Sequence, residues 1–143
     1  MKREDALQKS VAKLLDHSGL TWFHPANGEA RSAITGAKLK AMGVKAGAPD
    51  CMIFHPFPDP GSDENDRDLN EVRGYWMNGL AIELKAPDAN GKRPKPRPNQ
   101  IAWHERLRAC GWRVEVCYTM DEVLALLAEC YPNRFGNFAA PRP

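Results

Sequence analysis

Hydrophobic and polar positions alternate most clearly along residues 80–85, which read Leu-Ala-Ile-Glu-Leu-Lys. Successive side chains of a β-strand point to opposite faces of its sheet. One face of this segment is therefore entirely apolar and requires a packed core behind it. Glu83 and Lys85 share the opposite face, close enough together to act on one substrate. We predict that residues 79–86 form the central strand of a sheet.

Apolar residues at helical spacing predict helices along much of the remaining chain. The predicted helices cover residues 4–18, 29–42 and 98–110, and a capping box of Thr119 and Glu122 opens a last one. Apolar or alternating runs predict two further strands, at residues 49–54 and 112–118, and a short extended segment at 22–24.

Two segments lack such periodicity. Residues 55–79 are polar and contain prolines, which predicts an insertion that forms a long loop or an extended hairpin. Residues 131–143 carry Pro, Asn, Gly and Arg, which predicts a loosely attached tail.

The order of these elements predicts a single α/β domain. A strand–helix–strand crossover favours a parallel pair within the sheet, and strands between helices indicate a layered architecture with helices on both sides. A chain of 143 residues suffices for one such domain, with a core over about residues 4–130.

Composition excludes several classes of protein. The hydrophobic share of 43% and the charged share of 27% are ordinary for a soluble globular chain. No apolar run is long enough to span a bilayer, and the N-terminus lacks the apolar core of a signal peptide, so we expect a cytoplasmic protein without membrane contact. The four cysteines form no Cys-x-x-Cys pair, so we expect reduced thiols and no zinc site.

Candidate chemistry is centred on two carboxylates. Asp50 opens an otherwise apolar strand, where a buried carboxylate costs several kcal/mol unless it is paired or bound to a metal. If Glu83 lies beside it, the two provide the oxygen ligands that Mg²⁺ prefers. Lys85 would then orient a water or stabilise charge on a phosphoryl oxygen. Alternatively, Asp50 is a turn residue and the Glu-x-Lys pair is a solvated strand face, which is the more common meaning of an isolated pair.

Two other polar residues lie near buried faces of predicted helices. Gln100 falls on the packing face of its helix, where its amide must find a partner such as Glu83, Lys85 or a metal-bound water. Glu4 borders the buried face at the start of the first helix. There an acidic residue also stabilises the helix dipole, so a catalytic and a structural role both stay open for Glu4.

The net charge of +2 is small, but basic residues concentrate in two places. The first lies on and just after the second predicted helix, and the other is a proline-rich loop that follows the central strand. The basic residues are Lys38, Lys40, Lys45, Lys92, Arg93, Lys95 and Arg97. Both groups are candidates to bind a phosphate backbone. A solvated helix face is an equal alternative for the first, whereas the position of the loop favours contact with DNA over a solubilising linker.

Pro49-Asp50, Glu83-Leu84-Lys85 and Gln100, in this order, resemble the motifs of the PD-(D/E)XK nuclease superfamily. More narrowly, the chain resembles the VRR-NUC domain (virus-type replication-repair nuclease) in its small stand-alone form from phages and prophages. The resemblance extends to about Leu127 and also includes the segments 4–8, 24–28, 43–50 and 100–103. Each motif is weak by itself, but five in order at plausible spacing are a strong signal.

The resemblance implies a restriction-endonuclease-like core with a small mixed sheet. It implies that Asp50, Glu83 and the carbonyl of Leu84 bind Mg²⁺, with Mn²⁺ as a substitute, and that Lys85 and Gln100 complete the site. It allows a contribution from Glu4. The small members resemble Holliday-junction resolvases, which act as homodimers on branched DNA.

We therefore expect a metal-dependent endonuclease without a nucleotide cofactor, with Asn27 of the Asn27-Gly28 turn as a further DNA contact. Contacts to the phosphate backbone carry no sequence information, so we expect selectivity for DNA structure. Alternatives are the same fold cutting linear duplex, flaps or single strands, and a non-catalytic DNA-binding module. The chain departs from the family pattern in having Arg97 where a capping Ser or Thr is common, and in the length of segment 55–79.

Overall fold

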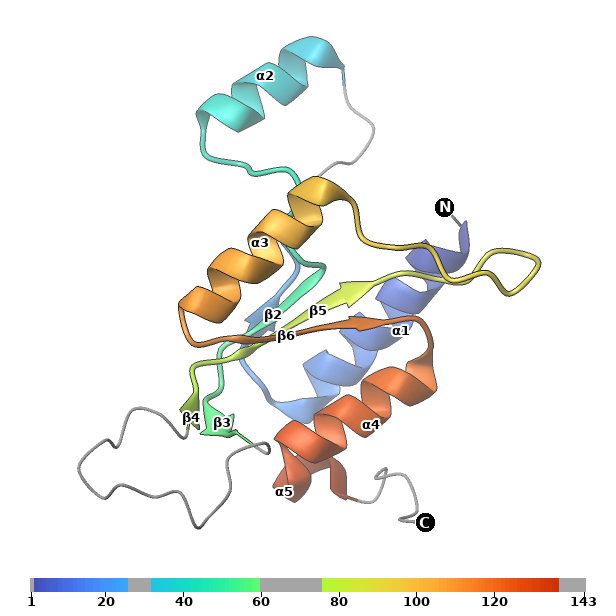
Figure 1. Cartoon of the computed structure of the whole chain (residues 1–143), viewed down its shortest axis with the longest axis vertical. Coiled ribbons are helices and arrows are strands. Elements are labelled where there is room, and N and C mark those ends of the chain that lie inside the picture. The colour runs from blue at the N-terminus through green and yellow to red at the C-terminus, as the bar shows by residue number, and fades with distance from the viewer. Residues whose placement is uncertain (1, 26–31, 60–75, 137–143) are drawn as a thin grey trace.

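The computed structural model describes residues 2–25, 32–59 and 76–136, and its centre is a four-stranded mixed sheet (Figure 1). The strands lie in the order β1-β2-β5-β6. Their bounds are Trp22–Phe23 for β1, Cys51–Ile53 for β2, Leu80–Leu84 for β5 and Arg113–Cys117 for β6. The first two pairings are antiparallel and β5 pairs with β6 in parallel, which confirms the predicted parallel pair.

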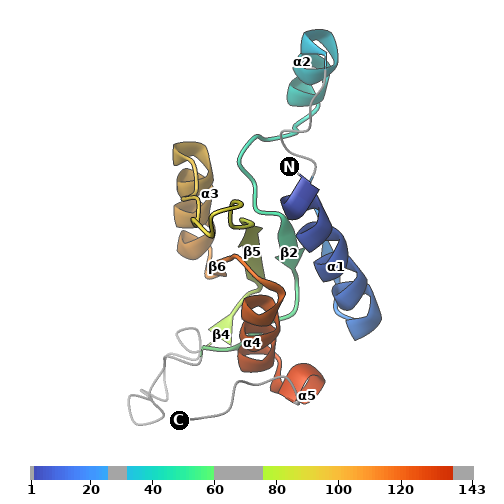
Figure 2. The ribbon, with the colours of Figure 1, turned by 90° about the vertical axis from the view of Figure 1, so that its right-hand side faces the viewer.

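Helices cover both faces of this sheet, as Figure 2 shows. On one face lie α1 (Lys2–Ser18) and α4 (Met120–Cys130), which enclose the main hydrophobic core. On the other face lies α3 (Pro98–Ala109), over a smaller apolar cluster. The layered α/β architecture predicted from the order of elements is confirmed.

Strand β5 is buried along its whole length. Its aliphatic residues at 80, 82 and 84 pack into the main core with Val11 and Leu15 of α1. Ala81 and Glu83 point to the opposite face, which α3 covers. Glu83 is only 1% exposed and Lys85, just beyond the strand, only 6%. The interpretation of this Glu-x-Lys pair as a solvated strand face is therefore wrong.

Helix α2 (Ala33–Ala41) stands apart from the layers (Figures 1 and 2). None of its residues is buried. It is shorter than the predicted helix because Ser32 caps it, accepting a hydrogen bond from the backbone N–H of Thr35 at 3.2 Å. Residues 29–31 of the prediction lie outside the described residues.

The insertion at 55–79 begins and ends as an antiparallel pair of short strands, β3 (Phe57–Pro58) and β4 (Trp76–Met77). The sequence predicted either a long loop or an extended hairpin, and the described ends of the insertion match the hairpin. Phe57 is fully buried against the Tyr131 ring, which anchors the hairpin to the main core. Residues 60–75 lie outside the described residues.

The C-terminal segment differs from the loosely attached tail that its composition predicted, as far as residue 136. Helix α5 (Pro132–Phe135) places Phe135 in the core, where it is 3% exposed. The hydroxyl of Tyr131 donates to the carbonyl of His55 at 2.8 Å, and Arg134 donates to the carbonyl of Ser18 at 2.7 Å. The prediction relied on the polar residues and gave too little weight to these two aromatic side chains.

Two further expectations concern the thiols and the membrane. All four cysteines are free, and Cys110 alone among them is exposed. Within residues 2–25, 32–59 and 76–136, no helix combines the length and the apolar character needed to cross a bilayer.

We expect Gly79→Ala to destabilise the fold by about 1–3 kcal/mol, because the added methyl group overpacks the start of β5. A Cβ atom there would lie 2.4 Å from the carbonyl oxygen of Ile53 and 2.6 Å from the Trp112 ring. Urea unfolding measures the effect. The matched control is Gly36→Ala on α2, where nothing lies within 4 Å and no loss is expected. Equal stability of the two variants would contradict this close packing.

Candidate active site

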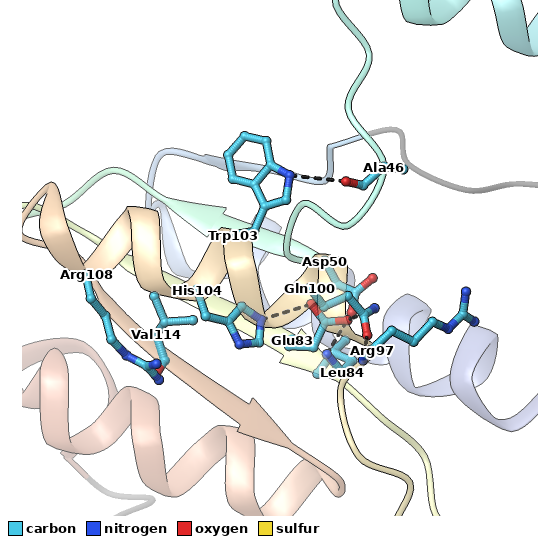
Figure 3. A network of polar contacts seen from close by, with 10 residues as sticks. All are labelled: Ala46, Asp50, Glu83, Leu84, Arg97, Gln100, Trp103, His104, Arg108 and Val114. Carbon is cyan, nitrogen blue, oxygen red and sulfur yellow. Dashed lines mark hydrogen bonds and ion pairs between the residues drawn. The ribbon is translucent and has the colours of Figure 1, made fainter.

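Asp50 and Glu83 meet where β2 and β5 lie side by side. Cys51 pairs with Ile82 in the antiparallel register, so one residue further along Asp50 lies opposite Glu83. Side chains that are directly opposite in such a pair project from the same face. The backbone N–H of Leu84 donates to Oδ2 of Asp50 at 2.7 Å, which holds this carboxylate against β5 (Figure 3).

Helix α3 supplies the partner that the buried carboxylate of Glu83 needs. The Nε2 of Gln100 donates to Oε1 of Glu83 at 2.7 Å, one of the contacts that the sequence predicted for this amide (Figure 3). The amide oxygen of Gln100 accepts a hydrogen bond from the backbone N–H of Arg97 at 2.8 Å. Gln100 therefore satisfies a backbone donor at the helix start while it holds Glu83, which offsets the missing Ser or Thr cap.

His104 is a second contact of Glu83 that the sequence interpretation missed. Its Nε2 lies 3.4 Å from Oε2 of Glu83, and the residue is 4% exposed. Its pKa is lowered by burial and by the charges of Arg108 and Lys85, so its imidazole is neutral near pH 7. Its spacing of four residues from Gln100 puts both on one face of α3, and this was the available signal.

Lys85 lies beside both carboxylates. It follows directly after β5, and its backbone N–H donates to the carbonyl of Cys117 at 3.0 Å, extending the pairing with β6. Its ammonium group is close enough to lower the pKa of both Asp50 and Glu83. The structure thus gathers two acidic groups and one basic group at one end of the sheet, as the sequence predicted.

Burial dominates the electrostatics of the acidic pair. Desolvation, followed by repulsion from Asp50, raises the pKa of Glu83 to about 8. Desolvation likewise raises the pKa of Asp50, although the hydrogen bond from Leu84 and the charge of His24 oppose it. Without a cation the pair therefore retains a proton near neutral pH, and a divalent cation would replace that proton.

The donor set fits magnesium or manganese better than zinc. Magnesium is usually held by one or two carboxylates and keeps several waters. Among the residues that the structure describes, no group of three or more His, Cys, Asp or Glu side chains is placed to hold a metal. Glu4 therefore does not complete a three-ligand cluster with Asp50 and Glu83. It lies near enough to Glu83 to contribute to the raised pKa of that residue.

The basic loop is held in place by one of its own predicted DNA-binding residues. Arg93 forms an ion pair with Glu122 at 2.6 Å, and its guanidinium lies 4.8 Å from the centre of the Tyr118 ring. The Tyr118 hydroxyl donates to the carbonyl of Pro94 at 3.0 Å. These contacts give Arg93 a structural function. Arg93 stays exposed in this pair, as do the side chains of the other basic residues of the loop, Lys92, Lys95 and Arg97.

The other basic group lies on the arm formed by α2. Lys38 and Lys40 are exposed on this helix, and Lys45 is exposed on the segment that leads from it to Asp50. That segment is tied to α3, because the indole N–H of Trp103 donates to the carbonyl of Ala46 at 3.1 Å (Figure 3). Asn27 lies outside the described residues.

His24 is a further neighbour of the site to which the sequence interpretation gave no function. Its Nδ1 lies 2.6 Å from the carbonyl oxygen of Asp50. It belongs to the segment 24–28 that resembles a family motif, which was the signal available for it.

A comparison with solved structures identifies the fold of the chain. A solved structure of a VRR_NUC domain protein superposes with a TM-score of 0.64 and covers 91% of this chain and 88% of that chain, at 22% sequence identity. The chain has the VRR_NUC fold. The predicted fold class, with its small mixed sheet between helices, is therefore confirmed. No family model and no curated protein matches the sequence, so the VRR_NUC likeness is carried by the structure.

We expect the metal-free protein to lose stability as the pH rises from 6.5 to 8.5. The pKa of Glu83 rises on folding from 4.5 to about 8, so between these pH values the folded state holds a proton that the unfolded state has lost. The contribution of this proton to stability is complete below pH 4.5 and is lost as the pH rises through about 8. The loss over this window is roughly 2 kcal/mol. Thermal unfolding in EDTA measures it, with exposed Glu105→Gln as a control that keeps the same slope. Stability that stays level or rises would contradict a protonated buried pair.

Proposed function

We propose that this protein is a metal-dependent nuclease that hydrolyses phosphodiester bonds of DNA. The observation that supports this proposal most directly is the pair of facing carboxylates, half-buried Asp50 and buried Glu83, with a buried lysine beside them. Two adjacent acids would destabilise the fold and repel DNA unless a cation neutralised them. The VRR_NUC fold, whose name denotes a nuclease, supports the same reaction class.

In this proposal, Asp50, Glu83 and the carbonyl of Leu84 hold Mg²⁺ or Mn²⁺. The cation, when bound, would supply Lewis acidity and make a coordinated water more acidic. Lys85 would orient the attacking water and offset charge that develops on the scissile phosphate. Gln100 would keep Glu83 in place through the hydrogen bond that it donates.

The exposed basic residues would bind the phosphate backbone on either side of this centre. We assign this function to Lys92, Lys95 and Arg97 of the loop and to Lys38, Lys40 and Lys45 of the α2 arm. Such contacts contribute affinity and position without reading bases. We therefore propose cleavage selective for DNA structure. The resemblance to small VRR-NUC proteins leads us to propose branched DNA such as a four-way junction as the substrate and a homodimer as the active form.

A digestion of two matched DNAs tests the proposal. A four-way junction and a linear duplex of the same sequence are incubated with the protein in Mg²⁺, in Mn²⁺ and in EDTA. We expect cleavage of the junction that requires a cation and is preferred over the duplex. Equal cleavage of the duplex would assign a different substrate to the same chemistry. A junction that is bound but stays intact with either cation would make the protein a DNA-binding module.

A further inference from the structure

We propose that His104 is a positioning residue for Glu83, whose carboxylate it orients toward Asp50, and that His104 thereby sets the affinity of the site for a divalent cation. This inference rests on the proposed metal-dependent function. It assigns a task to a buried polar side chain that the proposed chemistry does not otherwise use.

Two side chains of α3 each contact a different oxygen of the Glu83 carboxylate (Figure 3). Gln100 donates to Oε1 at 2.7 Å, and Nε2 of His104 lies 3.4 Å from Oε2. Because the two residues are four apart, they stand one above the other on the same face of the helix. One hydrogen bond leaves a carboxylate free to turn about its terminal bond. Contacts to both oxygens define the plane of the group.

The helix itself provides a fixed base for these contacts. The indole N–H of Trp103 donates to the carbonyl of Ala46, on the segment that leads to Asp50. One turn beyond His104, the guanidinium of Arg108 donates to the carbonyl of Val114 on β6 at 2.9 Å. These two bonds tie α3 to both sides of the site, so the imidazole of His104 is held at a constant position over Glu83.

The geometry of the acidic pair explains why such support matters. Asp50 is held by the backbone of Leu84, whereas Glu83 has a longer side chain and faces a like charge. When both carboxylates are charged, as cation binding requires, repulsion favours rotating Glu83 away from Asp50, which would separate the two ligands. Residues that hydrogen-bond a metal ligand in this manner typically change metal affinity or activity by about 10–100-fold when they are replaced.

Measuring cation binding by the full chain distinguishes a function of His104 in positioning Glu83 from a function in packing the core. Isothermal titration with Mn²⁺, without DNA, gives the dissociation constant of each variant. We expect His104→Ala to weaken Mn²⁺ binding by about 10–100-fold. His104→Gln retains an amide N–H near the place of Nε2 but carries no ionisable group, so it should restore binding to within about threefold if the hydrogen bond, and not a charge, is what matters.

The packing control is Leu107→Ala, on the same helix and also buried, but in the apolar cluster instead of beside Glu83. It should lower the melting temperature and leave the Mn²⁺ affinity unchanged. Should His104→Ala fail to fold, His104→Leu keeps the apolar volume and removes the hydrogen bond, and the same loss of affinity is expected.

Three outcomes would overturn the inference. These are unchanged Mn²⁺ binding by folded His104→Ala or His104→Leu, no recovery in His104→Gln, and an equal loss of affinity in Leu107→Ala. A wild-type chain that binds Mn²⁺ and cleaves DNA would keep its proposed function in all three cases. A wild-type chain that binds no Mn²⁺ would overturn the proposed function itself and this inference with it.

Discussion

Glu83→Gln is expected to abolish cleavage and, in the same molecule, to stabilise the metal-free protein. The amide has nearly the same shape as the carboxylate but cannot carry its charge. It would therefore remove both the desolvated charge and the repulsion from Asp50 that raise the pKa of Glu83. Each unit by which a pKa is raised corresponds to about 1.4 kcal/mol, so at pH 8.5 the neutral amide should stabilise the metal-free protein by on the order of a few kcal/mol. Loss of a metal ligand should reduce cleavage by on the order of 10³-fold or more, equivalent to about 4 kcal/mol of transition-state stabilisation.

Two measurements on the same variant check this expectation. Thermal unfolding in EDTA at pH 8.5 should give a higher midpoint for Glu83→Gln than for the wild type, and the difference should shrink when Mg²⁺ is added. Junction cleavage should be lost while junction binding in EDTA is kept. Glu105→Gln removes an exposed acid from α3 and should change neither property. A destabilised variant in EDTA, or one that still cleaves at the wild-type rate, would mean that the acidic pair is not a strained cation site.

Lys85→Ala is the second change with a large expected effect, and it should affect the reaction without affecting cation binding. The ammonium group lies beside both carboxylates and favours their charged forms. It is nevertheless no metal ligand, because a protonated amine has no lone pair to donate. Removing a group that stabilises developing charge typically lowers the rate by about 10²–10³-fold. The Mn²⁺ affinity should stay within about threefold of the wild type, or improve, since a neighbouring positive charge disappears.

The comparison that decides the function of Lys85 uses a second lysine. Lys92→Ala removes an exposed cation from the basic loop, so it should weaken DNA binding, increasingly at low salt, and leave the rate at saturating DNA unchanged. Lys85→Ala should show the opposite pattern, with a reduced saturated rate and DNA binding largely kept. If Lys85→Ala cleaved at the wild-type rate, this residue would have no function in the chemistry.

Local patterns predicted most of the elements that carry the site. The alternation along 80–85 and the apolar run after Asp50 identified β5 and β2 because strand periodicity is a property of a few neighbouring residues. The same pattern could not show that both faces of β5 are buried. That depends on α3 folding back over Glu83, and a face covered by a helix has the same local sequence as a face covered by water.

Residues with contacts far away in the chain were harder to predict. Phe135 docks into the core through α5, and Arg93 pairs with Glu122 while its side chain stays exposed. A basic residue in a proline-rich loop and an aromatic residue near a terminus have no local pattern that indicates their partners. The same holds for His104, because its function depends on Glu83, which lies 21 positions earlier in the chain and is brought next to it only by folding.

The sequence by itself determined the strands and helices that carry the site, and which acids, lysine and glutamine were candidates for it. These properties follow from side-chain spacing and from the cost of placing a polar group in an apolar run. The tertiary structure alone decided that Asp50 and Glu83 face each other, that Gln100 and His104 hold Glu83, and that Arg93 supports the loop. The physical reason is that strand register and helix docking are fixed by the packing of the whole core, which no short segment encodes.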